Sequence, residues 1–312
     1  MSRIGRSLGE QAYAEAFQAV QRALRRGESY EVNLTYQVRM ECTADATELY
    51  RWLRRANPAP YAALLRLPAV SVLSSSPERF LRVGRNGTVE ARPIKGTLPR
   101  GRDAAHDGAL RLSLGRDPKT FAENLMITDL LRNDLGQVSQ LGTIQVPALM
   151  VTESYQTVHQ LVTTVRGVLR PDVSPVQCVR SAFPGGSMTG APKLRTMEII
   201  DEVEPVARGV YAGALGYFSH SGDVDLSIVI RTMVLTGNRL SIGIGGGVVA
   251  ASEVDAERAE AELKAAALLS ALRAACAAPD GEPGSGPRHE GHGPGRPCDG
   301  ATGGSRHHSR SG

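Results

Sequence analysis

Phe80-Leu81-Arg82-Val83-Gly84-Arg85-Asn86-Gly87-Thr88-Val89-Glu90-Ala91-Arg92 is the stretch that decides the fold class. Two short runs, 80–83 and 88–92, flank Asn86-Gly87, which is the strongest short hairpin signal that a sequence offers. The stretch therefore predicts two neighbouring antiparallel strands joined by a tight turn.

The remaining elements follow in runs of strands with helices inserted between them. Further strands are predicted at 30–40, 143–147, 159–169, 211–219, 225–235 and 239–243. Helices are predicted at 9–26, 45–56, 103–114, 118–131, 175–182, 191–203 and 253–277. This order favours an α+β protein built on antiparallel sheet over a doubly wound parallel one. No strand leads into a dinucleotide fingerprint or a phosphate loop.

Composition narrows the class of protein. The chain has 312 residues, of which 41% are hydrophobic and 22% charged, so it is able to bury a sizeable core. The net charge is only +4 and no basic run occurs, which argues against nucleic-acid binding. No apolar run reaches the length of a membrane span, and the start does not resemble a signal peptide. We therefore expect a cytoplasmic protein without a membrane or nucleic-acid partner.

The cysteines and the tail complete this outline. Cys42, Cys178, Cys276 and Cys298 show no paired spacing of the kind that metal sites or small disulfide frameworks use. Reduced thiols are therefore expected. From 279 to 312 the chain loses its aliphatic side chains almost completely, and 15 of these 34 residues are Gly or Pro. We predict a folded domain over 1–278 and a disordered tail over 279–312.

Lys95 is unusual because the chain otherwise uses arginine for positive charge. Only four of the 36 basic residues are lysines, namely Lys95, Lys119, Lys193 and Lys264. A lysine kept against that bias indicates a side chain that must lose a proton and act as base or nucleophile. The simpler alternative is a surface lysine beside a turn.

Three glutamates are candidate metal ligands. Glu123 lies on the predicted helix 118–131, and Glu257 and Glu260 share one face of the last helix because they are three residues apart. Convergence of these carboxylates would give an oxygen-ligand site for Mg²⁺. Lys264, four residues after Glu260, supports the alternative of a solvated charged face.

Two glycine-rich segments and one arginine complete the candidates. The loop 184–190 opens a helix, which suits an anionic ligand or a simple helix cap. Gly245-Gly246-Gly247 follow a predicted strand end, where they indicate a bulge or a close approach of a ligand. Arg231 interrupts an apolar strand, so it pairs either with an acidic residue or with a ligand carboxylate.

The order of these motifs resembles that of the chorismate-utilising enzymes, over nearly all of residues 10–277. The resemblance rests on Ser29-Tyr30-Glu31-Val32-Asn33-Leu34, Ser76-Pro77-Glu78-Arg79-Phe80, 93–97, 122–126, Leu131-Arg132-Asn133-Asp134-Leu135, 184–193, 228–231, 245–247 and 257–264. Within this family the chain most resembles aminodeoxychorismate synthase component I, the aminating subunit of the 4-aminobenzoate pathway. The discriminating residue is Lys95, because anthranilate synthases usually have alanine at that position.

The resemblance implies two packed antiparallel sheets surrounded by helices, with chorismate and Mg²⁺ held between them. It implies Glu123 and Glu260 as Mg²⁺ ligands, with Glu257 behind them through water. It implies a covalent role for Lys95, acid/base chemistry for Glu78, and a place at the reaction centre for His159. The positions matching chorismate contacts are Gly96, Thr97, Ser187, Thr189, Tyr217, Arg231, Gly245, Gly246 and Gly247. The chain departs at Thr120, where anthranilate-forming relatives carry a further glutamate.

The implied activity is amination of chorismate to 4-amino-4-deoxychorismate through a covalent lysine intermediate. Ammonia would come from a glutamine amidotransferase, either a separate subunit or a fused domain. Whether the product serves folate or a secondary metabolite stays open. So do three alternatives: anthranilate synthase component I, a relative that adds water, and a truncated inactive chorismate-binding module. Family members carry a further N-terminal portion that adds strands, so we expect this chain to expose sheet edges.

Overall fold

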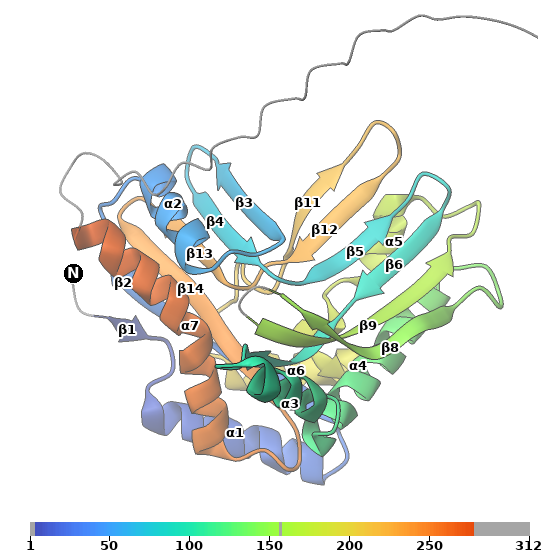
Figure 1. The fold of residues 1–312 in the computed structure, drawn as a ribbon, viewed down its shortest axis with the longest axis horizontal. Coiled ribbons are helices and arrows are strands. Elements are labelled where there is room, and N and C mark those ends of the chain that lie inside the picture. The colour runs from blue at the N-terminus through green and yellow to red at the C-terminus, as the bar shows by residue number, and fades with distance from the viewer. Residues whose placement is uncertain (1–3, 156–157, 278–312) are drawn as a thin grey trace, which may run out of the picture. The chain divides into compact units, whose positions relative to one another are not determined.

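The described part of the chain folds into two antiparallel sheets of seven strands each, with helices packed around them (Figure 1). The computed structural model describes residues 4–155 and 158–277. The predicted tail at 279–312 lies outside the described residues. The predicted α+β class with two packed antiparallel sheets is confirmed.

The first sheet has the strand order β1-β2-β14-β13-β4-β3, and β10 pairs with β2. Its strands are β1 (Gly5–Arg6), β2 (Glu31–Glu41), β3 (Tyr61–Arg66), β4 (Ser71–Ser76), β10 (Gly190–Ala191), β13 (Thr232–Thr236) and β14 (Arg239–Val248). The second sheet has the order β11-β12-β5-β6-β9-β7, and β8 pairs with β9. Its strands are β5 (Arg79–Val83), β6 (Thr88–Arg92), β7 (Ile94–Pro99), β8 (Gln145–Ser154), β9 (Val158–Val168), β11 (Ala214–Phe218) and β12 (Val224–Ile228). The hairpin predicted around Asn86-Gly87 is β5–β6, with Gly87 at φ +80° as the turn requires.

Seven α-helices and one 3₁₀ turn connect these strands in the described part of the chain. They are α1 (Glu10–Arg25), α2 (Ala46–Ala56), α3 (Ala104–Leu114), α4 (Pro118–Gly136), α5 (Pro175–Ala182), η1 (Gly186–Met188), α6 (Lys193–Val203) and α7 (Val254–Ala277). The predicted cap Asp45 accepts hydrogen bonds from the amides of Thr47 and Glu48. Helix α4 runs five residues past its predicted end at 131, because Leu135 in its last turn is fully buried. None of the described helices is long and apolar enough to cross a membrane.

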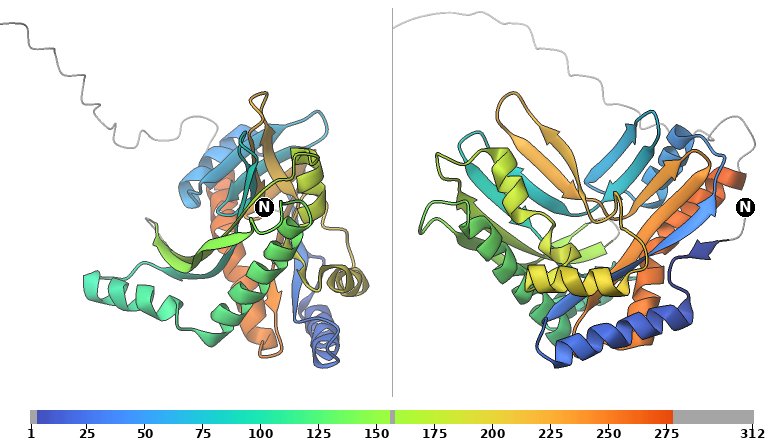
Figure 2. Two further views of the ribbon diagram at one scale, coloured as in Figure 1. Left: turned by 90° about the vertical axis from the view of Figure 1, so that its right-hand side faces the viewer. Right: turned by 180° about the vertical axis from the view of Figure 1, so that it is seen from behind.

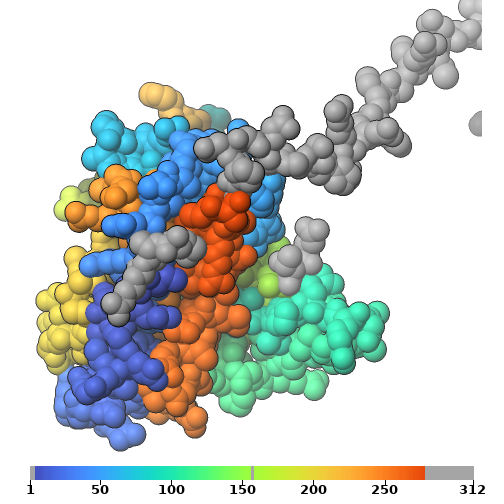
Figure 3. All heavy atoms as spheres, turned by 90° about the vertical axis from the view of Figure 1, so that its left-hand side faces the viewer, coloured from blue at the N-terminus to red at the C-terminus, as the bar shows by residue number. Residues whose placement is uncertain are grey.

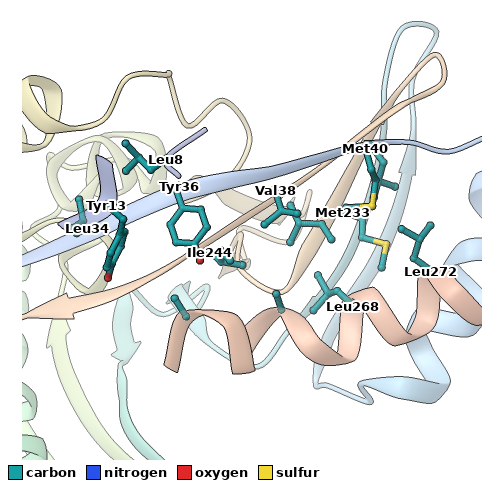
Figure 4. Close-up of a cluster of buried hydrophobic side chains, with 14 of the residues drawn as sticks. Leu8, Tyr13, Leu34, Tyr36, Val38, Met40, Met233, Ile244, Leu268 and Leu272 are labelled. Atoms are coloured by element: carbon teal, nitrogen blue, oxygen red, sulfur yellow. The ribbon is translucent and has the colours of Figure 1, made fainter. Parts of the chain in front are cut away.

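Each sheet has its own hydrophobic core. The first core lies between β2, β13 and β14 and the helices α1, α2 and α7, and Figure 4 shows Val38, Met233 and Ile244 facing Leu268 and Leu272 of α7. The second core joins β5, β6, β9 and β12 to α4 and α5. In the back view of Figure 2 the sheet with β5, β6, β11 and β12 lies on the left, and the sheet with β2 and β14 on the right. The polar residues considered below join the two halves.

Two segments of the chain pass from the first sheet to the second or back, and these two segments lie beside each other. β4 of the first sheet continues into β5 of the second through Pro77-Glu78, and β12 continues into β13 through 229–231. The Ile228 amide donates to the Glu78 carbonyl, and the Ser75 amide donates to the Arg231 carbonyl. The prediction of one strand over 225–235 was therefore wrong. Arg231 has φ +50°, which breaks the strand and turns its second half into the other sheet.

Two other local predictions need correction. The glycines 245–247 do not follow a strand end but lie inside β14, where Gly245 pairs with Thr35 and Gly247 with Asn33 of β2. The long partner strand β2 extends the pairing past the point where the sequence pattern of β14 stops. Strands β3, β4 and β7 were not predicted, because the segments 61–75 and 93–99 lack a clear alternation.

Helix α7 lies on the surface, flanked in Figure 3 by the blue N-terminal segments and the turquoise atoms near α3. It packs against α2 and β14. The cysteines Cys42, Cys178 and Cys276 are free thiols, as expected, and Cys298 lies outside the described residues.

Candidate active site

Lys95 lies on β7 at a bulge, where the register with β9 shifts between Ile94 and Thr97. Gly96 beside it has φ +89°, and a Cβ there would lie 2.5 Å from Thr120 Cγ2 on α4. Glycine is therefore required for both backbone conformation and close packing. The bulge turns the Lys95 side chain inward, where only 10% of it is exposed, so the surface-lysine alternative is excluded.

The Lys95 ammonium is paired with carboxylates from two directions. Its Nζ donates to Glu31 Oε1 on β2, and Glu123 Oε2 on α4 lies 3.7 Å away. Burial works to lower the pKa of Lys95, but the negative charges of Glu31 and Glu123 outweigh it and raise the pKa above its ordinary value. Without a ligand, Lys95 is a protonated ion-pair partner and not yet a nucleophile.

Lys119 joins the helices α4 and α7 across the same site. Its Nζ lies 2.5 Å from Glu257 Oε1 and 3.8 Å from Glu123 Oε1. The Glu257 side chain is 2% exposed, and its Oε1 also accepts a hydrogen bond from Ser252 Oγ at 2.6 Å. Burial raises the pKa of Glu123 to about 7, since Lys95 and Lys119 offset only part of that effect.

Glu260 and Lys264 form the outer edge of this group. Lys264 Nζ lies 2.8 Å from Glu260 Oε1, as the solvated-face alternative predicts, and also donates to the Gly245 carbonyl at 3.1 Å. Burial would raise the pKa of Glu260, yet the adjacent Lys264 charge and hydrogen bond hold it below its ordinary value. Both interpretations of this helix face therefore apply in part. Glu260 is half exposed, as on a solvated charged face, whereas Glu257 is buried, as in a site of converging carboxylates.

The glycines of β14 form one wall of the site. A Cβ at Gly247 would overlap Glu31 Oε1 and lie 3.1 Å from Lys95 Nζ. A Cβ at Gly246 would lie 3.3 Å from Glu257 Oε2 and 3.4 Å from Lys264 Nζ. Glycine keeps this strand open, so that the charged side chains or a ligand can approach its backbone.

Glu78 and Arg231 enter the site from the two sheet crossovers. Burial raises the pKa of Glu78 to about 7, against a hydrogen bond from the Ser187 hydroxyl and the charge of Lys95. Burial lowers the pKa of Arg231, with partial compensation from Tyr211 and Glu260. The Arg231 guanidinium makes no hydrogen bond or ion pair with the residues that the structure describes. An unpaired guanidinium at this depth suits an anionic ligand.

Several predicted residues are not part of this charged group. Both ring nitrogens of His159 are engaged, Nδ1 with Ser154 Oγ at 2.8 Å and Nε2 with Asp107 Oδ1 at 2.9 Å. Thr189 is buried and its hydroxyl donates to carbonyls of its own loop. Thr97 is exposed on β7, and Tyr217 is 58% exposed on β11.

A hollow of about 440 Å³ lies elsewhere, between η1, α6 and the segment 205–213. Its walls include Met188, Met197, Glu204 and Arg208, and neither Lys95 nor the glutamates around it. The charges of Glu204 and Arg208 are already paired with each other. The convergence of ionisable side chains, rather than the size of a hollow, therefore identifies the candidate site.

Sequence reasoning missed two members of the site, Glu31 and Lys119. Glu31 belongs to a matched segment but received no role, although a lone acidic residue opening an apolar strand is a signal. Lys119 is one of only four lysines, so the scarcity argument used for Lys95 applied equally to it. Three of the four lysines meet at this site.

A family model described as chorismate binding enzyme matches residues 1–270. The chain belongs to the chorismate binding enzyme family. It is 56% identical over 263 residues to an aminodeoxychorismate synthase from Streptomyces pristinaespiralis, covering 84% of this chain and 37% of that protein. It is 45% identical to aminodeoxychorismate synthase component 1 from Klebsiella aerogenes, covering 81% of this chain and 56% of that protein.

The solved structures agree with the fold of this chorismate-binding domain. Anthranilate synthase component I from Streptococcus pneumoniae superposes with a TM-score of 0.78 at 32% identity, covering 85% of this chain and 59% of that one. The chain therefore spans between about a third and about three fifths of the length of these relatives. It is an aminodeoxychorismate synthase-like chorismate-binding domain.

The family is typically Mg²⁺-dependent, and the residues present fit such an ion. In the described part of the chain, no three His, Cys, Asp or Glu side chains are close enough together to hold a metal as they stand. The carboxylates of Glu123 and Glu257 lie against the Lys119 ammonium, at 3.8 Å and 2.5 Å. Buried carboxylates gathered around one cation are a donor set suited to Mg²⁺.

Proposed function

We propose that this domain aminates chorismate to 4-amino-4-deoxychorismate with ammonia. The observation that carries the proposal is Lys95, a buried amine between the two sheets with Glu31 and Glu123 against it. The identity to aminodeoxychorismate synthases supports the same reading, and so does lysine rather than alanine at this position. The proposal extends to Mg²⁺ held by Glu123 and Glu260, with Glu257 behind them through water.

Substrate binding uses charges that the domain leaves unmatched. Arg231 binds the side-chain carboxylate of chorismate, together with Tyr217 if β11 closes toward it. The backbone of Gly245–Gly247, Gly96 and Thr97, and the loop with Ser187 and Thr189, would enclose the ring. A metal held by Glu123 and Glu260 would supply a Lewis acid for the ring carboxylate, which would withdraw electron density from the diene.

The covalent step begins with removal of a proton from Lys95. Glu31, which already accepts a hydrogen bond from Nζ, is the adjacent acceptor. The free amine adds to the ring carbon next to the carboxylate-bearing carbon, the double bonds shift, and the ring hydroxyl departs. Glu78, whose pKa of about 7 keeps a proton available near neutral pH, protonates the departing hydroxyl so that it leaves as water.

The second step reverses the first with a different nucleophile. Ammonia adds at the vacated ring carbon, the double bonds shift back, and the bond to Lys95 breaks. Lysine is restored as an amine, and the amino group stands where the hydroxyl stood. We infer that a glutamine amidotransferase partner supplies the ammonia in a cytoplasmic setting, and we assign His159 a positioning role through Asp107.

Product identification tests this function directly. The purified chain is incubated with chorismate, MgCl₂ and ammonium, and the product is identified by mass spectrometry. The expected product is 4-amino-4-deoxychorismate, which retains the enolpyruvyl group. Anthranilate, which lacks that group, or isochorismate or salicylate, which carry oxygen in place of nitrogen, would contradict the proposal.

A second candidate is a chorismate-binding module that does not turn over. It is favoured by the exposed side chains Leu65 and Arg66 on the edge strand β3. Calorimetric titration with chorismate that gives binding, together with an absence of product, would identify this case.

A further inference from the structure

The Lys119 ammonium lies between α4 and α7, the two helices that carry the proposed Mg²⁺ ligands. It projects from α4, and Glu123 four residues later lies on the same face of that helix. Glu257 comes from α7, so one ammonium neutralises carboxylates from both helices. Neither Lys119 nor this bridging contact was assigned a role by the sequence motifs.

The charge balance of the site shows why such a cation is needed. Among the described residues, five carboxyl groups gather here, from Glu31, Glu78, Glu123, Glu257 and Glu260. The lysines that face them are Lys95, Lys119 and Lys264. Because Glu31, Glu78 and Glu257 are almost completely buried, loss of one ammonium leaves carboxylate charge that water reaches poorly.

Exposure and position together indicate which lysine leaves its carboxylates: Lys264, 31% exposed, is paired with Glu260 of its own helix, whereas Lys119 faces carboxylates of both helices. The Lys95 side chain is only 10% exposed, and its Nζ lies against Gly247 of β14. The Lys119 side chain is 35% exposed and starts in the first turn of α4. A rotation of its long side chain therefore brings the ammonium into water.

We propose that Lys119 is a built-in counter-ion that holds the metal position in the metal-free protein and leaves it when Mg²⁺ binds. The proposal rests on the proposed function for the position of the metal. The ammonium competes with Mg²⁺ for Glu123 and neutralises Glu257 behind the ion, so Lys119 lowers the affinity for Mg²⁺. It also keeps the two helices paired when the ion is absent.

Isothermal titration calorimetry with MgCl₂ alone, without chorismate, tests this proposal on the full chain. Lys119→Met, which keeps an unbranched side chain without charge, should bind Mg²⁺ roughly tenfold more tightly than wild type, because the competing charge is gone. Lys119→Arg keeps the charge and should show no gain. Lys193→Met is the matched control, since it removes another lysine from a buried carboxylate outside this site.

Thermal unfolding in EDTA supplies a second measurement. Lys119→Met should unfold at a lower temperature than wild type in EDTA, and saturating MgCl₂ should raise its Tm by more than it raises that of wild type. If Lys119→Met does not fold, Lys119→Gln replaces it in both experiments.

The outcomes separate this proposal from the function on which it rests. Tighter binding confined to the neutral Lys119 variants supports it. Unchanged or weaker binding in those variants overturns it, and so does an equal gain in Lys193→Met. If no variant binds Mg²⁺, the counter-ion proposal is overturned, and the product assay decides separately whether the amination proposal stands.

Discussion

The molecule buries lysine in two places, and the two differ in how completely the charges are matched. At the start of α6, Lys193 Nζ lies 2.7 Å from Asp134 Oδ2 and donates to the Ala182 carbonyl at 2.9 Å. One ammonium thus meets one carboxylate, and the pair ties α6 to α4 and α5. A closed pair of this kind holds elements together and leaves no charge for a ligand.

The charges of the site between the sheets are not matched one to one in this way. Its carboxyl groups outnumber its lysines, and Arg231 has no acidic partner among the described residues. Glu31 Oε2 is buried without a hydrogen-bond partner in that part of the chain. Unsatisfied buried groups cost stability, so a fold that keeps several of them together is suited to bind a charged ligand there.

Substitution of Lys95 is expected to have the largest effect on the site between the sheets. Lys95→Ala should lower amination by at least about a thousandfold, because no other side chain supplies the nucleophile. Lys95→Arg should fail equally, since a guanidinium stays protonated. Steady-state amination rates with ammonium measure both variants. An arginine variant with most of the activity would rule out covalent catalysis by this residue.

The proposed metal ligands give the next largest effect. Glu123→Gln and Glu260→Gln should each lower Mg²⁺-dependent turnover by about tenfold or more, because each removes a formal charge from a site with few protein ligands. Glu253→Gln, exposed just before α7, is the control and should change little. Rates measured across MgCl₂ concentrations distinguish these cases. Equal losses at all three positions would indicate a general effect on the helix.

The closed pair should behave in the opposite way, affecting stability rather than chemistry. Lys193→Met leaves Asp134 buried without its partner and should cost about 3–5 kcal/mol of unfolding free energy. Urea unfolding measures this loss. The double variant Lys193→Met/Asp134→Leu should recover much of it, and activity per folded molecule should stay close to wild type. A single variant as stable as wild type would show that the pair does not hold these helices.

A smaller effect concerns pH and Glu78. Its folded-state pKa of about 7 lies above its ordinary value, so the folded protein binds this proton more tightly than the unfolded chain does. This tighter proton binding stabilises the folded protein fully at pH values below the ordinary pKa of the carboxyl. As the pH rises through about 7, the free energy of unfolding falls by roughly 2–3 kcal/mol. Thermal unfolding in EDTA from pH 5 to 8 should show the decline. Glu78→Gln should remove its own part of the decline and leave that of Glu123, whose pKa is also raised to about 7. A wild-type profile without a decline contradicts the burial of these carboxyls.

Much of the secondary structure could be predicted from the pattern of adjacent residues in the sequence. The β5–β6 hairpin, α2 with its Asp45 cap and α5 after Pro175 were predicted because turn and cap chemistry is set by a few adjacent residues. The single strand predicted over 225–235 failed because its apolar pattern is continuous. What divides it is the backbone of Arg231, which is set by the sheets on either side. The glycines of β14 were misplaced for a similar reason, since pairing with β2 and not their own propensity keeps them in a strand.

The sequence by itself determined which residues have unusual chemistry: scarce lysines, glutamates on helical faces, an arginine among apolar residues and glycines in a row. The tertiary structure alone decided which of them meet. Lys95 and Glu31 are 64 positions apart and come from different sheets, and Lys119 and Glu257 are 138 apart on different helices. The physical reason is that side-chain identity is local, whereas the balance of buried charge depends on all the elements that converge at one point.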